Sequence, residues 1–300
     1  MTYAIGLDIG GTSIKALAVT PGGRVLAQTA LPTGDTCTRG WRLNVRRAKD
    51  ELQGLLNQPP AWIGLAAPGL AASDQTSIAF MPGRLPGLEG LVWKKFLKAP
   101  CPVPVMNDAH AALLGEIWRG AARRSRNAIL LTLGTGVGGA AMVDGQLLRG
   151  HLGRAGHFGH ISLDYSGAPD IVGTPGSLED AIGNCTVRAR CGGRFDSTHA
   201  LVAAATAGDA DARHAWLQSV RALAVGIVSL VNSLDPEVVV IGGGIAQAKA
   251  ALLRPLKRML DEIEWRPGGS KVRVVLATLG DRAGAFGAAW NAIQFEQNTR

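Results

Sequence analysis

The pair Asn107-Asp108 follows a short apolar run, residues 103–106, and precedes a stretch of helix-forming residues. A carboxylate at the end of a strand could accept the proton of a substrate hydroxyl, and the resulting oxygen could attack a phosphate group. Both residue types also cap helices, because their side-chain oxygens accept hydrogen bonds from the first backbone N–H groups. Their spacing alone leaves both roles open for Asp108.

A glycine-rich segment near the start runs from Asp8 through Gly10, Gly11 and Thr12 to Lys15. The glycines let backbone N–H groups approach phosphate oxygens, and Thr12 can donate its hydroxyl. Asp8 could hold Mg²⁺ directly or through water. The alternative is a hairpin without a ligand, and the GxxxxGK[ST] order of a Walker A loop is missing.

Two more glycine runs follow apolar strands. The run Gly134-Thr135-Gly136-Val137-Gly138-Gly139 superficially fits the GxGxxG pattern of dinucleotide-binding folds. That fold needs a helix next, whereas a strand and an Asp144-Gly145 turn follow, so we interpret the run as a second phosphate-facing hairpin. Gly242-Gly243-Gly244 could admit a flat ligand such as adenine, or could simply turn a strand into a helix.

A third polar group lies in the glycine-rich stretch 153–179, which contains His157, His160 and Glu179. Polar side chains gathered in one loop could bind a polyhydroxylated ligand. A single histidine is more often structural or solvated, so these residues gain weight only from the other motifs.

Hydrophobic periodicity and turn residues predict alternating strands and helices. A strand, a glycine turn and a returning strand occur twice, at residues 3–19 and 128–148, and two related lobes of this kind can place one ligand between them. We expect strands at residues 3–7, 14–19, 24–30, 62–66, 103–106, 128–133, 140–143, 238–241 and 272–277, and helices at 41–56, 109–122, 177–192, 198–206, 210–233, 249–263 and 283–293.

Length and charge suit a two-domain protein with an anionic ligand. The chain has 300 residues and a net charge of +8, with a sequence pI of about 9.7. A basic balance suits nucleotides, nucleic acid or acidic membranes. The densest basic clusters, 42–49 and 119–126, are typical of solvated helix faces, so we expect no nucleic-acid partner.

The four cysteines, which include Cys37, form no CxxC or CxC pair, and this is typical of a reducing compartment. The sequence shows no secretion signal. No segment approaches the ~18 apolar residues of a membrane helix. We therefore expect a cytoplasmic protein with no membrane association.

Taken together, these motifs resemble the ROK family, named for repressors, open reading frames and kinases, of the actin/Hsp70/sugar-kinase superfamily. The markers occur in order over nearly the whole chain, and their order and spacing make coincidence improbable. They are Leu7–Thr12, Ala67-Pro68-Gly69, Asn107–Ala112, Leu133–Gly138, Ala155-Gly156 with Gly159-His160, Gly176–Glu179, Gly242–Gly244 and Gly284–Ala289.

The resemblance implies a two-domain α/β fold of the actin/hexokinase (ribonuclease H-like) type with a central cleft. The expected domains are residues 1–112, joined by the C-terminal helix 283–300, and a larger C-terminal domain at 113–282. ATP is expected mostly on the C-terminal domain with its phosphates between the glycine hairpins, and a sugar deeper in the cleft. Family members are usually homodimers.

The resemblance also assigns roles to residues. Asp108 matches the catalytic base, and Gly69, Asn107, His160 and Glu179 match sugar-binding positions. The expected nucleotide and Mg²⁺ residues are Asp8, Gly10, Gly11, Thr12, Lys15, Gly134, Thr135, Gly136, Gly138, Gly242, Gly243 and Gly244, with Asp8 as the Mg²⁺ residue.

Two departures limit this transfer. The family's zinc motif CxCGxxGCxE is matched in spacing, but Asp170, Val172 and Ser177 replace its cysteines, so we expect no zinc site. His157 stands where kinases of the family have a glutamate that binds sugar hydroxyls. Imidazole lacks the bidentate carboxylate, so this replacement either is filled in by water or indicates a sugar other than glucose.

The resulting interpretation is an ATP-dependent kinase that phosphorylates a hexose-like sugar, with Mg²⁺ and without zinc. A repressor is disfavoured, because the first hairpin begins at Tyr3 and no DNA-binding module precedes it. The remaining alternative is a catalytically weak or inert sugar sensor of the same fold. Retention of Asp8, Asp108 and both glycine hairpins favours catalysis.

Overall fold

The computed structural model describes residues 1–34 and 38–299, and Cys37 lies outside them. The chain divides into two compact units. Unit 1 comprises Met1–Arg124, Arg149–Ala155 and Thr278–Arg300, and unit 2 comprises Ser125–Leu148 and Gly156–Ala277. Unit 1 extends past residue 112, the limit suggested by the sequence, because that residue lies inside α3 (Asp108–Arg119), a helix that packs whole against α9 (Ala283–Thr299).

Unit 1 is built on a five-stranded sheet in the order β3-β2-β1-β4-β7. The first three strands form the expected antiparallel meander, and β4 and β7 join β1 in parallel. A small antiparallel pair, β5 and β6, was not foreseen. The strand bounds are β1 Ala4–Ile9, β2 Ser13–Val19, β3 Val25–Pro32, β4 Trp62–Ala67, β5 Leu70–Ala71, β6 Ile78–Phe80 and β7 Val105–Asn107.

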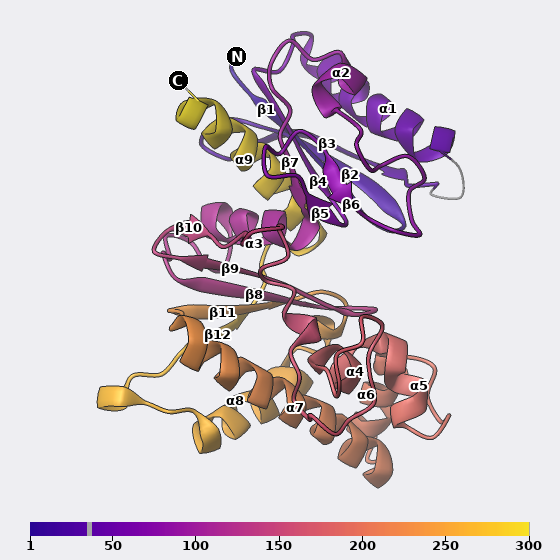
Figure 1. Ribbon diagram of the computed structural model, residues 1–300, viewed down its shortest axis with the longest axis vertical. Coiled ribbons are helices and arrows are strands. Elements are labelled where there is room, and N and C mark those ends of the chain that lie inside the picture. The colour runs from indigo at the N-terminus through magenta and orange to yellow at the C-terminus, as the bar shows by residue number, and fades with distance from the viewer. Residues whose placement is uncertain (35–37, 300) are drawn as a thin grey trace. The chain divides into compact units, whose positions relative to one another are not determined.

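Helices cover both faces of this sheet (Figure 1). Alternate side chains of β1, including Ile5 and Leu7, pack with α1 (Thr38–Leu56) and the short α2 (Trp93–Leu97) in one apolar core. The intervening positions, such as Ala4, pack with α9 on the other face. Period-two burial of this kind is what an internal strand of a three-layer α/β unit requires.

Helix α9 makes unusually close backbone contacts in unit 1. A Cβ on Gly6 of β1 or Gly64 of β4 would overlap a carbonyl oxygen of α9. Gly287 of α9 and Gly115 of α3 show the same relation across the pair of helices. Glycine therefore allows α9 to lie against the backbone of the sheet and of α3.

The buried Glu116 of α3 fixes the chain that leads into α9. Its Oε1 accepts hydrogen bonds from the Thr278 N–H group at 3.0 Å and from the Leu279 N–H group at 2.9 Å. In the same unit, Nε2 of the buried His110 donates to the Ala155 carbonyl oxygen at 2.9 Å. These two contacts tie segments that are distant in sequence to helix α3.

Unit 2 repeats the sheet topology of unit 1. Its strand order is β10-β9-β8-β11-β12, with an antiparallel meander followed by two parallel strands. The duplication expected from residues 3–19 and 128–148 is thus confirmed. The strands are β8 Ala128–Leu133, β9 Val137–Val143, β10 Gln146–Leu147, β11 Val238–Gly242 and β12 Arg273–Leu276.

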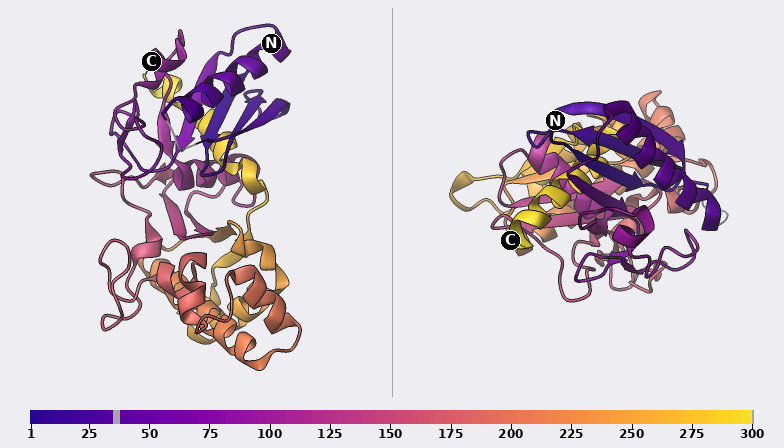
Figure 2. Two further views of the ribbon diagram at one scale, coloured as in Figure 1. Left: turned by 90° about the vertical axis from the view of Figure 1, so that its right-hand side faces the viewer. Right: turned by 90° about the horizontal axis from the view of Figure 1, so that it is seen from above.

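The helices of unit 2 gather on one side of its sheet (Figures 1 and 2). The longest, α7 (Ala210–Leu234), buries Trp216, Val220 and Leu223 in the core with α8 (Ala250–Ile263) and the sheet. By length and composition α7 could also cross a membrane, contrary to the expectation that no segment qualifies. Its many Ala, Val and Leu residues raise the mean hydropathy, while its buried face packs as a core helix.

One expected helix, residues 177–192, is wrong. The structure has α4 (Leu178–Ile182), a short 3₁₀ turn at Asn184–Thr186 and α5 (Val187–Arg190). Gly183 breaks the helix with an extended ψ of 152°, and the next two N–H groups donate to the carbonyl oxygens of Gly134 and Thr135. Pairing with a distant glycine turn outweighs local helix propensity here. Helix α6 spans Thr198–Thr206 as expected.

Candidate active site

The junction of β7 and α3 separates the two roles left open for Asn107 and Asp108. Asn107 is the N-cap, because its side-chain oxygen accepts from the N–H groups of Ala109 at 2.9 Å and His110 at 3.3 Å. Its amide nitrogen donates to the Gly69 carbonyl oxygen at 3.0 Å. Asn107 is 6% exposed. Its hydrogen bond to Gly69 links two residues that were both predicted to bind sugar.

Gly69 itself requires glycine. Its φ is +96°, and an added Cβ would lie 2.5 Å from the Phe80 carbonyl oxygen and 2.7 Å from Cβ of Met81. Both the backbone conformation and the crowding exclude a side chain. The hydrogen bond from Asn107 therefore holds a backbone carbonyl that only glycine can present at this position.

Asp108 is the first residue of α3 and is exposed. Its Oδ1 accepts from the Ala109 N–H group at 2.8 Å, a group that Asn107 also binds. Asn107 thus already serves as the N-cap, and the hydrogen bond from Ala109 to Asp108 adds no newly paired N–H group. Its position at a strand-to-helix corner suits a group that handles a proton of a bound ligand.

Asp8 of β1 has a strongly perturbed acidity. Burial, and then the negative charge of Asp108, raise its pKa to about 7, against the lowering effect of Lys15. The carboxylate lies beside the first turn of α9, where a Cβ on Gly284 would overlap it. Because the carboxylates of Asp8 and Asp108 repel each other when both are ionised, a cation bound beside them would lower the energy of the ionised pair.

This acidity predicts a pH-dependent stability. Between pH 3.8 and about 7 the folded protein keeps a proton on Asp8 that the unfolded chain has lost, so stability falls as pH rises through this window. Asp8→Asn stays neutral, and without ligands it should be more stable than the wild type at pH 8.5 by a few kcal/mol, since a tenfold change in an acid dissociation constant corresponds to about 1.4 kcal/mol. The difference should be small at pH 4, in urea unfolding with the magnesium chelator EDTA present. Parallel pH curves for the two proteins would contradict the prediction.

The turn between β1 and β2 is shaped by its own backbone and by Thr33. Gly10 N–H donates to the Ser13 carbonyl oxygen at 3.0 Å, and the buried Thr33 hydroxyl donates to the Gly10 carbonyl oxygen at 2.7 Å. Thr33 N–H donates in turn to the Thr12 carbonyl oxygen at 3.0 Å. Thr12 itself is exposed, and Lys15 forms an ion pair with Asp281 at 3.4 Å.

The corresponding turn of unit 2 is braced from two sides. Gly134 N–H donates to the Gly136 carbonyl oxygen at 2.9 Å, and the N–H groups of Asn184 and Cys185 donate to the outward carbonyl oxygens of the turn at 3.0 and 2.8 Å. Glu179 accepts from the Val137 N–H group at 2.9 Å. Glu179, predicted to bind sugar, therefore also supports the turn that is predicted to bind phosphate.

A cavity of about 600 Å³ opens beside this turn within unit 2. Gly134 and Thr135 line one side and Gly244 another, so the structure brings these two glycine motifs together. Gly243 has a φ of +85° and no room for a Cβ beside Leu133, whereas Gly244 is open. The remaining wall mixes apolar and polar groups: Asn184, Ser197, Thr198, His199, Val202, Ala203, Thr206, Ile245, Gln247, Ala248 and Ala251.

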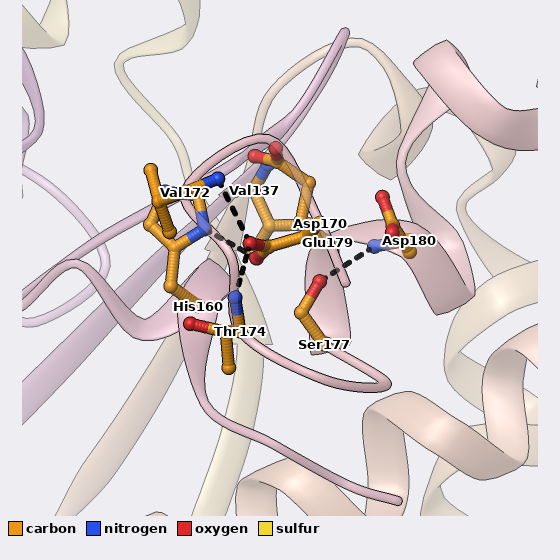
Figure 3. A network of polar contacts seen from close by, with 8 residues as sticks. All are labelled: Val137, His160, Asp170, Val172, Thr174, Ser177, Glu179 and Asp180. Carbon is orange, nitrogen blue, oxygen red and sulfur yellow. Dashed lines mark hydrogen bonds and ion pairs between the residues drawn. The ribbon is translucent and has the colours of Figure 1, made fainter. Parts of the chain in front are cut away.

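A buried carboxylate organises the loop that carries His160. Figure 3 shows Asp170 accepting from His160 Nδ1 at 2.8 Å and from the Val172 and Thr174 N–H groups at 3.0 and 2.9 Å. Burial would raise the pKa of Asp170, but these hydrogen bonds, first that from His160, outweigh burial and lower the pKa to about 2. An ionised Asp170 thus fixes Nδ1 of His160 as the protonated ring nitrogen.

The residues of this loop do not fit a zinc ion. Asp170 already accepts three hydrogen bonds from the protein. Val172 offers no ligand and is 62% exposed, and Ser177 caps α4 by accepting from the Asp180 N–H group at 3.2 Å. In residues 1–34 and 38–299 no three His, Cys, Asp or Glu side chains form a possible metal cluster. At this position, where the family motif has a cysteine, Asp170 holds the loop together by hydrogen bonds to His160, Val172 and Thr174.

We predict that the purified protein contains no stoichiometric zinc and that a zinc chelator leaves its melting temperature unchanged. Asp170→Ala should instead destabilise it by about 1–2 kcal/mol, since it removes three hydrogen bonds from partly buried donors. Elemental analysis and thermal unfolding measure both effects. One tightly bound zinc per chain, with stability lost on chelation, would overturn this interpretation.

The sequence did not predict every residue that supports the site. The supporting roles of Thr33, Asn184 and Asp170 follow only from their contacts with the predicted motifs. Spacing signalled Asp170 only as a missing cysteine. His157 lies immediately before the 3₁₀ turn Phe158–His160, and the His160 N–H group donates to the carbonyl oxygen of His157 at 3.2 Å.

Comparisons with known proteins show which family the chain belongs to. The sequence model of the ROK family matches residues 4–294. The glucokinase of Halalkalibacterium halodurans is 32% identical over 328 residues, covering 99% of this chain and 96% of that protein. The glucokinase of Streptomyces coelicolor is 31% identical and covers 96% and 97%.

Two solved structures show the same fold over the whole chain. A ROK hexokinase from Thermus thermophilus superposes with a TM-score of 0.85 at 30% identity, covering 99% of this chain and 100% of the other. A ROK family glucokinase from Streptomyces griseus, in complex with glucose and AMPPNP, gives 0.78 at 28% identity, with coverages of 97% and 99%. The actin-like sugar-kinase fold expected from the motifs is confirmed, and the chain belongs to the ROK family as an ATP-dependent sugar kinase.

Proposed function

We propose that Asp108 is the general base of this kinase and that its acceptor is a hydroxyl of a hexose-like sugar. The observation that carries the assignment is the N-cap that Asn107 provides, so that the carboxylate beside it adds no newly paired N–H group. Deprotonation of the hydroxyl makes its oxygen a nucleophile toward the γ-phosphorus of ATP. In unit 1 we assign Gly69 and Asn107 to sugar binding, and for His157, His160 and Glu179 of unit 2 sugar binding stays a prediction from the resemblance.

We assign the adenosine of ATP to the 600 Å³ cavity of unit 2. Its volume is in the range of small-molecule sites, and its wall has the mixture of apolar surface and few polar groups typical of them. The N–H groups and hydroxyl of the Gly134–Gly136 turn bind phosphate oxygens, as do those of Gly10–Thr12 in unit 1.

Magnesium fits the donor set of unit 1, where Asp8 is the residue that would hold it. When bound, Mg²⁺ neutralises charge on the transferring phosphates. Asp8 is suited to this, because burial first and the charge of Asp108 second raise its pKa, and a bound cation would offset the cost of ionising this carboxyl group. The rest of the rate comes from positioning the hydroxyl and from preorganised N–H donors.

The experiment that tests the function is a coupled ADP-release assay with ATP and Mg²⁺ over a panel of aldoses, ketoses and amino sugars. Sugar-dependent ADP release supports the proposal. Saturable sugar binding by calorimetry without ADP release would favour the inert sensor instead. We also propose a cytoplasmic protein with no nucleic-acid or membrane partner. We propose that it is a homodimer, which sedimentation analysis of the active enzyme tests.

His157 is proposed to set sugar preference. A site built for a hydroxyl discriminates when its partner is changed, because buried polar groups are left unpaired. We expect the wild type to use glucose poorly and His157→Glu to shift kcat/KM toward glucose relative to the best alternative sugar. If the wild type already prefers glucose, or if both substrates change equally, His157 does not determine specificity.

A further inference from the structure

Arg84 lies on the turn that we assign to phosphate binding in unit 1. Its Nη2 donates to the carbonyl oxygen of Gly11 at 3.3 Å. A Cβ built on Gly11 would lie 2.9 and 3.2 Å from the two terminal guanidinium nitrogens. The guanidinium therefore covers Gly11, which is the middle residue of the Gly10–Thr12 turn.

The loop that carries Arg84 is anchored to the core of unit 1. Leu85 and Leu88, on either side of a turn, are each only 1% exposed and belong to the apolar core that contains Trp41. Leu88 N–H closes the turn on the Leu85 carbonyl oxygen at 2.9 Å, and the indole N–H of Trp41 donates to the Pro86 carbonyl oxygen at 3.2 Å. Arg84 itself is exposed, so a fixed backbone presents a solvated guanidinium.

The charges nearby leave a need for a cation at this turn. Asp8 belongs to β1, the strand that leads into this turn, and the carboxylate of Asp281 is paired with Lys15 at 3.4 Å. A phosphate chain brought to the turn adds further negative charge beside these carboxylates. Guanidinium binds phosphate oxygens in a bidentate manner and keeps its charge at any physiological pH.

We propose that Arg84 binds the phosphoryl group during its transfer, an inference that rests on the proposed sugar kinase reaction. In that step the bond between the γ-phosphorus and the bridging oxygen breaks, and its electron pair stays on ADP. The sugar oxygen forms the new bond to phosphorus, and its proton goes to Asp108. Arg84 stabilises the charge on the non-bridging oxygens, which is greatest in the transition state.

The test compares Arg84→Gln and Arg84→Lys with Arg47→Gln, a matched loss of charge on the exposed surface of α1. We expect Arg84→Gln to lower kcat by about 10²–10³-fold with the KM for sugar nearly unchanged, and Arg84→Lys to recover part of this loss. Arg47→Gln should behave as the wild type. Inhibition by ADP with aluminium fluoride, which resembles the phosphoryl group in transfer, should weaken in Arg84→Gln by a similar factor.

The outcomes separate the two proposals. A wild type that releases no ADP with any sugar overturns the sugar kinase assignment and this inference with it. An active wild type with Arg84→Gln at near-normal kcat and undiminished inhibition overturns the role of Arg84 alone. A variant that only melts earlier and binds ATP less well, with kcat kept, shows that Arg84 merely ties its loop to the turn.

Discussion

Asp108→Asn is expected to lower kcat by about 10²–10⁴-fold, the usual contribution of a general base, while nucleotide affinity changes little. Asparagine keeps the size of the side chain, and its carbonyl oxygen can still accept from the Ala109 N–H group that Asp108 binds at 2.8 Å. The variant loses the capacity to take a proton and the negative charge that contributes to the raised pKa of Asp8. Because the start of α3 keeps its hydrogen bonds, the melting temperature should stay close to that of the wild type.

Asn107, the neighbouring residue, supplies a comparison variant that is expected to lose stability, which Asp108→Asn should keep. Asn107→Ala removes the helix cap and the hydrogen bond to Gly69, so it should cost about 1–2 kcal/mol of stability. Asp50→Asn, a carboxylate on the exposed surface of α1, should change neither stability nor turnover. Steady-state kinetics and thermal unfolding distinguish these variants. Near-normal turnover by Asp108→Asn would remove this residue from the mechanism.

The elements carrying the glycine turns could be predicted because their signals are local. Alternating apolar residues on either side of Asp8 and the glycines give a strand, a turn and a returning strand wherever they occur. The same signal at Gly134 also revealed the duplication, which both sheets share. Strand β7 and helix α3 followed from an apolar run, a capping residue and a stretch without breakers.

What could not be predicted depends on partners distant in sequence. The break at Gly183 exists because the next two residues bind the turn at Gly134 and Thr135, about 50 residues earlier, and no propensity encodes that pairing. Thr33 and Arg84 reach the first turn from other strands and loops in the same way. From the sequence, Asn107 and Asp108 were equally good candidates for the N-cap of α3. Only the hydrogen bonds of their side-chain oxygens show that Asn107 is the cap.

Gly287→Ala is expected to destabilise unit 1 by roughly 3 kcal/mol, at the upper end of overpacking effects. The new Cβ would overlap the carbonyl oxygen of Ala111, and the carbonyl carbon behind it lies only 2.5 Å away. Moving α3 away would also break a second close contact, since a Cβ on Gly115 would overlap the carbonyl oxygen of Ala283 in α9. Since α3 begins at Asp108, any shift that relieved the clash would also displace the proposed base.

Gly54→Ala on the exposed surface of α1 is the matched control, because no atom lies within 4 Å of the position of its added Cβ. Alanine favours helix over glycine by up to about 1 kcal/mol, so this variant should be as stable as the wild type or more stable. Urea unfolding of the two variants measures the difference. Equal stabilities would show that α3 and α9 separate freely, and the close packing of α9 would then not be what holds the carboxylate of Asp108 in place.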